Sequence, residues 1–234
     1  MQKEIKILKV RFDNVTLQEA LHRALEFTKS NSQHYICTPN PEIVLAAHKN
    51  HKFLSILNRS SLNIPDGAGI IWAAKRQKTP LKSRVTGVDL MKKICKESKK
   101  RIFLLGAEEG IAEDAAKKLK ANIVGTHSGS PKVEDEKEII EKLNRLKPEI
   151  LFIAYGAPAQ ELWIARNLKK IPSVKLAMGV GGSFDFIAGK TKRAPKWMQK
   201  LSIEWLYRLI KEPRRIKRIL NATVRFPITF LKKG

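Results

Sequence analysis

Several short turns in this sequence carry side chains suited to binding a polar ligand. Thr38–Glu42 (TPNPE) follows an apolar run, and its prolines fix the backbone on either side of Asn40. Pro65–Gly69 (PDGAG) offers the carboxylate of Asp66 ahead of two glycines. Arg84 stands just before a predicted helix start, where free backbone N–H groups favour an anion. These turns predict a polar site, although Asn-Pro also begins ordinary helices and Pro-Asp-Gly also forms ordinary caps and turns.

Glycines follow further predicted strands. Gly181 and Gly182 come directly after the apolar run 174–180, and paired glycines let the backbone approach a ligand closely because no Cβ intervenes. The turn 106–110 (GAEEG) resembles a shortened phosphate-binding turn, but it matches neither the dinucleotide fingerprint nor a P-loop. A nicotinamide-dependent enzyme is therefore disfavoured.

Predicted strands alternate with predicted helices along the whole chain. The strands are expected at 4–12, 35–37, 62–64, 101–105, 123–127, 150–155 and 174–180. The first helix begins at Thr16, and Glu19 three residues later completes a capping box. Such alternation predicts an α/β fold with a mostly parallel sheet and helices on both faces. Ligands of these sheets bind beyond the carboxyl ends of the strands, so the polar turns should share one rim.

The C-terminal segment differs in composition from the rest of the chain. Residues 190–234 hold 14 basic and 2 acidic residues, a net charge of +12 and half of the chain's +24. One helix is expected from about 195 to 211 and a second from 213 to about 225. Their apolar positions are Met198, Leu201, Trp205 and Leu209 in the first, and Ile216, Ile219, Leu220 and Val224 in the second.

An apolar stripe beside basic residues is typical of a helix that lies in a lipid headgroup layer. Arg214, Arg218 and Arg225 lie opposite the stripe of the second helix. The expected interfacial anchors are Trp197, Trp205, Tyr207 and Phe226. The alternative is a tail folded onto its own core, with its arginines in water.

Composition also excludes several classes of protein. The two cysteines, Cys37 and Cys95, predict neither a disulfide framework nor a zinc site. The first residues lack the apolar core of a signal peptide, and no run approaches the ~20 apolar residues of a spanning helix. We therefore expect a cytoplasmic protein that can lie on a membrane. The charge would also suit nucleic acid, but no RNP-like aromatic pattern or zinc knuckle occurs, so no nucleic-acid partner is expected.

Six motifs, taken in order, resemble one family closely. They are TPNPE from Thr38, PDGAG from Pro65, RVTGVDL from Arg84, GAPAQE from Gly156, GVGGSFDF from Gly179, and RAPKWM from Arg193 with EWLYR from Glu204. Each motif alone is weak, and their ordered combination is specific. On these residues the sequence is similar to the bacterial glycosyltransferases of the TagA/WecG/CpsF type, glycosyltransferase family 26.

The resemblance implies a Rossmann-like α/β core, an inverting mechanism without a metal or other cofactor, a UDP-sugar donor and a polyprenyl-diphosphate-linked sugar acceptor. Wall teichoic acid members of the family transfer N-acetylmannosamine from UDP-N-acetylmannosamine to N-acetylglucosaminyl-diphosphoundecaprenol in a β-1,4 linkage. Related members use the corresponding uronic acid or other sugars. The sequence contains no Asp-x-Asp motif for a metal. The donor sugar and the oligomeric state, a homo-oligomer included, stay open.

The resemblance also suggests roles for individual residues. Asp66 matches the family's proposed base, and Thr38 and Asn40 are expected to position hydroxyl groups. The substrate-binding candidates are Arg84, Gly106, Tyr155, Gly156, Pro158, Gln160, Gly181, Gly182 and Asp185. Arg214, Arg218 and Arg225 are expected to face the membrane or the lipid diphosphate. Residues 1–192 should form the catalytic core, and 193–234 a basic amphipathic appendage that docks on the inner face of the cell membrane.

Overall fold

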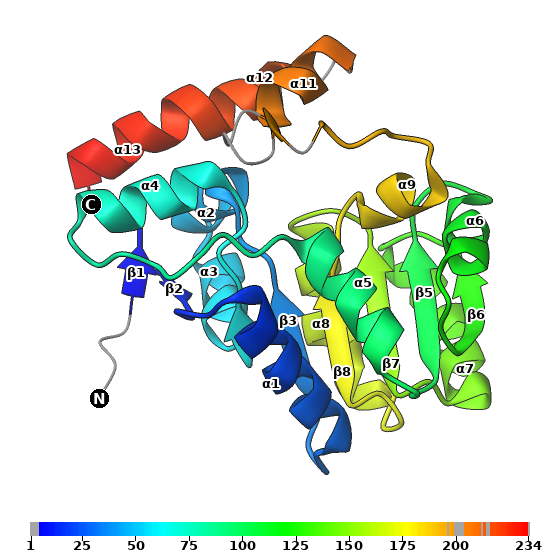
Figure 1. The fold of residues 1–234 in the computed structure, drawn as a ribbon. Helices are drawn as coiled ribbons and strands as arrows, with labels where there is room; N and C mark the ends of the chain where they lie inside the picture. The colour runs from blue at the N-terminus through cyan, green and yellow to red at the C-terminus, as the bar shows by residue number, and fades with distance from the viewer. Residues whose placement is uncertain (1–4, 196, 199–203, 212, 214–215, 234) are drawn as a thin grey trace.

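A six-stranded parallel sheet forms the centre of the molecule, in the strand order β4-β3-β8-β7-β5-β6 (Figure 1). The computed structural model describes residues 5–195, 197–198, 204–211, Pro213 and 216–233. The strands are β3 (His34–Cys37), β4 (Leu62–Asn63), β5 (Ile102–Gly106), β6 (Ile123–His127), β7 (Ile150–Ala154) and β8 (Leu176–Gly179). Every neighbouring pair is parallel, which confirms the predicted sheet.

Helices cover both faces of the sheet because side chains alternate along each strand. In β5, Ile102 and Leu104 point to one hydrophobic cluster, while Phe103 and Leu105 point to another. The first face is covered by α1 (Leu17–Lys29), α5 (Gly87–Glu97), α6 (Ile111–Lys118) and α9 (Ser183–Ala188). The second is covered by α7 (Glu136–Leu146) and α8 (Ala159–Asn167), which adjoin the short 3₁₀ turns Val133–Asp135 and Leu168–Lys170.

The N-terminal segment forms a hairpin rather than the single strand predicted for 4–12. Strands β1 (Ile5–Ile7) and β2 (Val10–Phe12) pair antiparallel, apart from the main sheet. The turn between them places Leu8 and Lys9 at φ of 48° and 71°. Non-glycine residues rarely adopt this left-handed conformation, so the local sequence did not indicate the turn. Glu4 lies outside the described residues.

A third hydrophobic cluster joins the hairpin, strand β3 and the last helix. The helices α2 (Pro41–His48), α3 (His51–Asn58) and α4 (Ala68–Arg76) contribute half of its buried residues. Phe226 and Phe230 of the last helix complete it, with 0 % and 4 % of their surface exposed. The Phe230 ring also meets Trp72 of α4 edge to face, with the ring centroids 5.6 Å apart. The last helix is therefore packed against the core (Figure 1).

The C-terminal helices extend further than predicted. They are α11 (Glu204–Lys211), α12 (Ile216–Leu220), a π-helical turn (Asn221–Arg225) and α13 (Phe226–Lys233). The expected helix end near Arg225 is wrong, because the chain passes through the π turn just before Pro227 and stays helical. Phe226 is also no interfacial anchor, since it is buried. Leu201 and Arg214 lie outside the described residues.

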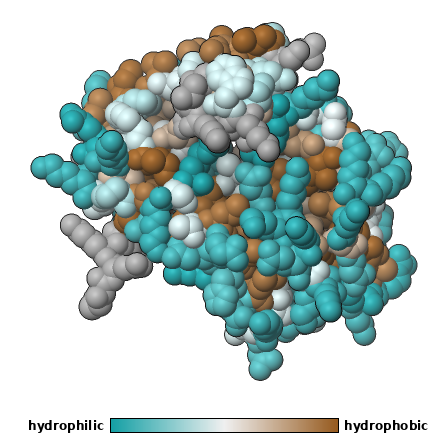
Figure 2. Space-filling model, in the orientation of Figure 1, coloured by the Kyte–Doolittle hydropathy of each residue, from teal (hydrophilic) through white to brown (hydrophobic). Residues whose placement is uncertain are grey.

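The outward side of these helices is apolar (Figure 2). Five of its side chains, spaced by three or four residues, expose between 45 % and 59 % of their surface: Ile216, Leu220, Val224, Ile228 and Leu231. We call these five the apolar face. Trp197 and Trp205 are exposed as well, at 58 % and 40 %. Among the helices described, none is long and apolar enough to cross a bilayer.

Candidate active site

A cleft of about 1260 Å³ opens at the carboxyl end of the sheet, beneath the C-terminal helices. Its volume exceeds the roughly 300–1,000 Å³ typical of a pocket for one small ligand, so it has room for parts of two substrates. The turns after β3, β4, β7 and β8 and the start of α5 form its wall. Of the predicted site residues it gathers thirteen: Thr38, Asn40, Asp66, Arg84, Tyr155, Gly156, Pro158, Gln160, Gly181, Gly182, Asp185, Arg218 and Arg225.

Gly106 is the predicted site residue that the structure places elsewhere. It is not among the residues that line the cleft, and it is buried. Its φ is +98°, and a Cβ at this position would lie 2.9 Å from the Tyr155 ring. The glycine is thus explained by packing against Tyr155. Of the tail arginines, Arg214 is outside the described part of the chain.

Asp66 is held at the start of α5. It follows β4, and its Oδ2 accepts a hydrogen bond of 3.2 Å from the backbone N–H of Gly87. Its own backbone N–H donates to the carbonyl of Pro39 at 3.3 Å. The alternative role as a helix cap is not seen, because α4 has Gly67 at its N-cap and no side-chain cap bond. The carboxylate is half-buried and lines the cleft.

Thr38 and Asn40 both lie on the turn after β3, with different surroundings. The Thr38 hydroxyl donates to the carbonyl of Gly179 on β8 at 3.4 Å, and only 7 % of the residue is exposed. Asn40 caps α2, since its Oδ1 accepts from the backbone N–H of Ile43 at 2.9 Å. The ordinary reading of Asn-Pro as a helix start is therefore correct, and Asn40 lines the cleft as well.

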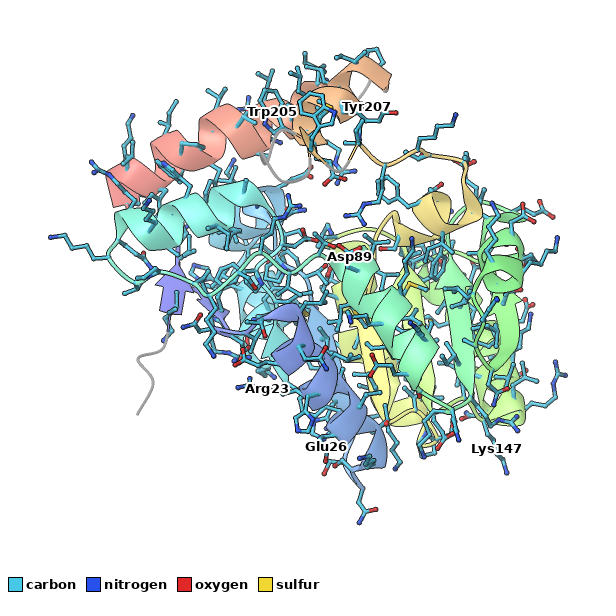
Figure 3. All side chains as sticks on the ribbon, viewed as in Figure 1. Arg23, Glu26, Asp89, Lys147, Trp205 and Tyr207 are labelled. Atoms are coloured by element: carbon cyan, nitrogen blue, oxygen red, sulfur yellow. The ribbon has the colours of Figure 1, made fainter. Side chains whose placement is uncertain are left out.

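Arginines and carboxylates from the core and the C-terminal segment meet above α5. Arg193 donates to Asp89 from both terminal nitrogens, at 2.6 and 3.3 Å. Its Nε lies 3.7 Å from Glu204 of α11, whose other oxygen is 3.9 Å from Arg84. Figure 3 shows Asp89 at the end of α5 nearest the C-terminal segment, with Trp205 and Tyr207 on α11 above it. Arg193 was missed as a site residue, although it begins one of the motifs.

The charges in this cluster shift the pKa values of its members. Burial acts to raise the pKa of Asp89, but hydrogen bonds from Arg193 and Thr86 and the Arg193 charge outweigh it and lower the pKa. For Arg193, burial acts to lower the pKa, while Asp89, Glu204 and Asp66 raise it. Both groups are therefore charged near neutral pH.

Two tail arginines have partners inside or beside the cleft. Arg218 binds both carboxylate oxygens of Glu42 on α2, at 2.8 to 3.0 Å. Arg225 donates to Asn221 Oδ1 at 3.1 Å. Ile219 also lines the cleft, so this side of α12 faces the core. The tail is thus folded onto its own core on one side and exposes the apolar face on the other.

Gln160 and Glu161 form a buried link to the turn after β8. Gln160 Oε1 accepts from the backbone N–H of Gly181 at 3.0 Å, and its Nε2 donates to Glu161 at 2.8 Å. Burial raises the pKa of Glu161 to about 7, although the hydrogen bond from Gln160 opposes this shift. Glu161 does not line the cleft, and its link to the cleft wall was not predicted; an acidic residue close to Trp163 and Ile164 in a buried helix was the available indication.

The described residues contain no group of three or more His, Cys, Asp or Glu side chains placed to hold a metal ion. The positive groups that line the cleft are instead arginines, with Lys49. These groups suit an anionic ligand such as a diphosphate.

Comparison with known proteins identifies the family of this chain. The model of the glycosyl transferase WecG/TagA/CpsF family matches residues 5–234. An N-acetylglucosaminyldiphosphoundecaprenol N-acetyl-beta-D-mannosaminyltransferase of Staphylococcus aureus (strain MRSA252) is 36 % identical over 230 residues, covering 94 % of this chain and 90 % of that protein. The protein of the same description from strain MW2 is 35 % identical with the same coverage. With the family match running from β1 through the cleft to α13, the chain belongs to the glycosyl transferase WecG/TagA/CpsF family.

Proposed function

We propose that this protein transfers N-acetylmannosamine from UDP-N-acetylmannosamine to N-acetylglucosaminyl-diphosphoundecaprenol, with inversion at the anomeric carbon and a β-1,4 product. The acceptor and the transferred sugar follow the description of the S. aureus relatives. The observation that carries the proposal is one cleft that joins the Asp66 carboxylate to arginines from the core and from the C-terminal helices. A base and an anion-binding wall are what a transfer from a nucleotide sugar needs.

Asp66 is the proposed base. An inverting transfer requires a group that takes the proton from the acceptor hydroxyl as its oxygen attacks the anomeric carbon. The hydrogen bond from Gly87 orients one oxygen of the Asp66 carboxylate. The other oxygen is the one we assign to the acceptor hydroxyl. Thr38 and Asn40, on the neighbouring turn, are proposed to position the sugar hydroxyl groups.

The departing UDP carries negative charge that the cleft must stabilise. Arg84 and Arg193 converge on the single carboxylate of Glu204 at distances longer than a hydrogen bond. Arg193 also contacts Asp89 in the first turn of α5, and Arg84 lies three residues before that helix, so backbone N–H groups of the helix start add to their positive field. We assign the diphosphate to this region. Gly156, Gly181, Gly182 and Asp185 are the proposed contacts to the rest of the nucleotide and the sugar.

The acceptor's lipid requires that the cleft reach a bilayer, and residues 193–234 are the proposed docking appendage. The apolar face would enter the headgroup layer, because its five residues share one side of a continuous helical stretch. Lys217, Lys232 and Lys233 are proposed to contact anionic headgroups, each contributing about 1 kcal/mol. Since α11–α13 also roof the cleft, docking would bring the site to the lipid diphosphate. We place the protein on the inner face of the cell membrane.

A UDP-release assay tests the proposal directly. Purified protein is given a panel of UDP-sugars and a short-chain lipid-diphosphate N-acetylglucosamine acceptor. We expect turnover that depends on both the acceptor and UDP-N-acetylmannosamine, and that persists in excess EDTA. Turnover only with the uronic acid donor would assign the protein to another surface polysaccharide. RNA binding without vesicle binding or turnover would favour a nucleic-acid function.

A further inference from the structure

The cleft wall after β8 is held by a residue that no ligand can reach. Glu161 lies in the first turn of α8 and is fully buried, with 0 % of its surface exposed. Its Oε1 accepts a hydrogen bond of 2.8 Å from Gln160 Nε2. Its Oε2 is buried without a hydrogen-bond partner. A buried carboxyl group with an unpartnered oxygen is costly, so its presence calls for an explanation.

The partners of Gln160 determine how its amide is turned. The backbone N–H of Gly181 can only donate, so Gln160 must offer it the amide oxygen, at 3.0 Å. The amide nitrogen then points to Glu161, which accepts. If the amide turned over, its nitrogen would meet the Gly181 N–H, so two hydrogen-bond donors would face each other. Glu161 and Gly181 therefore specify one orientation between them.

Packing holds the Gln160 side chain in the same place. Only 1 % of Gln160 is exposed, and a Cβ on Gly179 of β8 would lie 2.5 Å from its Nε2. Gln160 therefore fills the space that the missing Gly179 side chain leaves. The amide oxygen and the amide nitrogen of Gln160 both bond to other groups of the protein, so Gln160 acts on the cleft by holding Gly181.

The turn that this link holds faces open space. Gly181 has φ of +50°, and a Cβ built on it would meet no atom within 4 Å. With Gly182 it forms the part of the cleft wall that leads into α9. A glycine pair has few steric restraints of its own, so its shape depends on bonds such as the one to Gln160.

We propose that Glu161 is a positioning residue, which orients the Gln160 amide and thereby holds the Gly181–Gly182 turn in the conformation that binds the nucleotide part of the donor. The inference rests on the proposed function, because it takes the ligand at this turn to be a nucleoside diphosphate sugar. Glu161 itself touches no substrate. Its contribution is a fixed backbone N–H and carbonyl geometry at the turn.

Two substitutions at this position separate the acceptor role from simple packing. Glu161→Gln keeps an oxygen that accepts from Gln160, whereas Glu161→Leu fills similar space and removes the acceptor. The matched control is Glu136→Leu, because Glu136 is another buried carboxylate, lies on α7, and is paired with Arg166 away from the cleft. The dissociation constant for UDP is measured by calorimetry, and KM and kcat with the donor and the acceptor are measured separately.

We expect Glu161→Leu to raise the dissociation constant for UDP and the KM for the donor by about tenfold, as for the loss of one well-placed hydrogen bond. The KM for the acceptor should change little. The Glu161→Gln variant should have the wild-type dissociation constant for UDP and the wild-type KM for the donor. Glu136→Leu should lower thermal stability without changing UDP binding. In a double-mutant cycle, Gln160→Leu should abolish the effect of Glu161→Leu, because the two act in series.

Unchanged UDP binding by folded Glu161→Leu, beside a wild type that binds UDP, would overturn this inference and leave the proposed function standing. A wild-type protein without affinity for UDP would overturn both. If Glu161→Leu does not fold, Glu161→Ser replaces it, since serine is polar but too short to reach Gln160. The same tenfold weakening is then expected, and wild-type affinity would contradict the inference.

Discussion

Arg193 and Asp89 are 104 residues apart in the sequence and are joined by two hydrogen bonds of 2.6 and 3.3 Å. Asp89 lies in the first turn of α5, where it also accepts from the Thr86 hydroxyl at 2.5 Å. Arg193 is the first residue of the proposed appendage, and it faces Glu204 of α11 as well. The pair thus ties the C-terminal segment to the helix start that supports Asp66.

Arg193→Ala should loosen α11 without unfolding the core. The substitution leaves the half-buried Asp89 without its main partner, and we expect a local cost of about 1 kcal/mol or more. Hydrogen exchange in peptides from 204–211 should then become about fivefold faster, while the strands keep their protection. Lys192→Ala is the control, because the neighbouring side chain is exposed. Identical exchange in the two variants would show that the ion pair does not hold α11.

Asp66→Asn should remove most of the turnover. Asparagine keeps the oxygen that accepts from Gly87 but cannot take a proton, so kcat should fall about 100- to 10,000-fold. UDP binding should change by less than about twofold, because no nucleotide contact is assigned to Asp66. The two quantities are measured by UDP release and by calorimetry. Near wild-type turnover would end the assignment of Asp66 as the base.

The apolar face should be required for membrane binding and not for folding. We choose Leu220→Ser, Val224→Ser and Leu231→Ser together, because these three residues are exposed and do not line the cleft. Sedimentation with anionic vesicles should show binding at least about tenfold weaker, as expected from losing buried apolar area. Val133→Ser is the control, since Val133 is 64 % exposed on another part of the molecule. If the triple variant bound vesicles like the control, another surface would be the docking site.

Phe226→Ala should destabilise the whole protein. Phe226 is fully buried in the cluster that includes α2 and α4, and such a truncation costs about 3–5 kcal/mol. For a chain of this size, the melting temperature should fall by roughly 6–20 °C. Ile228→Ala removes a 49 % exposed side chain two residues later and should cost less than about 0.5 kcal/mol. Equal melting temperatures for the two variants would mean that α13 does not pack on the core in solution.

The stability of the protein should fall as the pH rises through the weakly acidic range, because the Glu161 carboxyl group keeps its proton when buried and loses it when the protein unfolds. Its pKa is raised from 4.5 to about 7 in the folded protein, chiefly by burial. Between these values the folded state binds a proton that the unfolded state has lost, so the free energy of unfolding decreases with pH and levels off above about 7. The total change is up to about 3 kcal/mol.

Glu161→Gln has no such group, so the stability difference between the two proteins measures this effect. In denaturant unfolding at pH 4.5, 6 and 8, the free energy of unfolding of Glu161→Gln relative to that of the wild type should increase at each higher pH. A difference that stays constant across these pH values would mean that Glu161 titrates normally. Because the comparison uses the change in the difference, a constant offset from the substitution does not affect it.

Local patterns were sufficient to place the six strands of the main sheet along the chain, but they predicted neither the β1–β2 hairpin nor α4. Strands such as β5 and β7 alternate between two apolar faces, and Thr16 with Glu19 forms the predicted capping box. Both features depend on residues only a few positions apart, so they can be read without knowing the fold. The six motifs could likewise be recognised in the sequence, and the comparisons place the chain in the family they indicated.

Residues with the same local sequence pattern lie in different surroundings in the structure, and the sequence pattern alone does not distinguish them. Gly106 ends strand β5 and Gly181 follows strand β8, and both have positive φ. The first packs against Tyr155 and the second opens into the cleft, because the order of strands in the sheet decides which turn has a neighbour above it. Phe226 was predicted to be exposed like its apolar neighbours, because the spacing of apolar residues in a helix does not show which side of the helix packs on the core.

Turn chemistry and side-chain periodicity are local, so the sequence alone determined the parallel sheet, the polar rim and the family. The tertiary structure decided which rim residues form one cleft, that Arg193 reaches Asp89, and that Glu161 supports Gly181 through Gln160. Strand order brings the rim residues together into one cleft. The C-terminal segment folds back over the core, and this brings Arg193 to Asp89. The link from Glu161 to Gly181 depends on how two buried side chains satisfy each other, which local spacing does not encode.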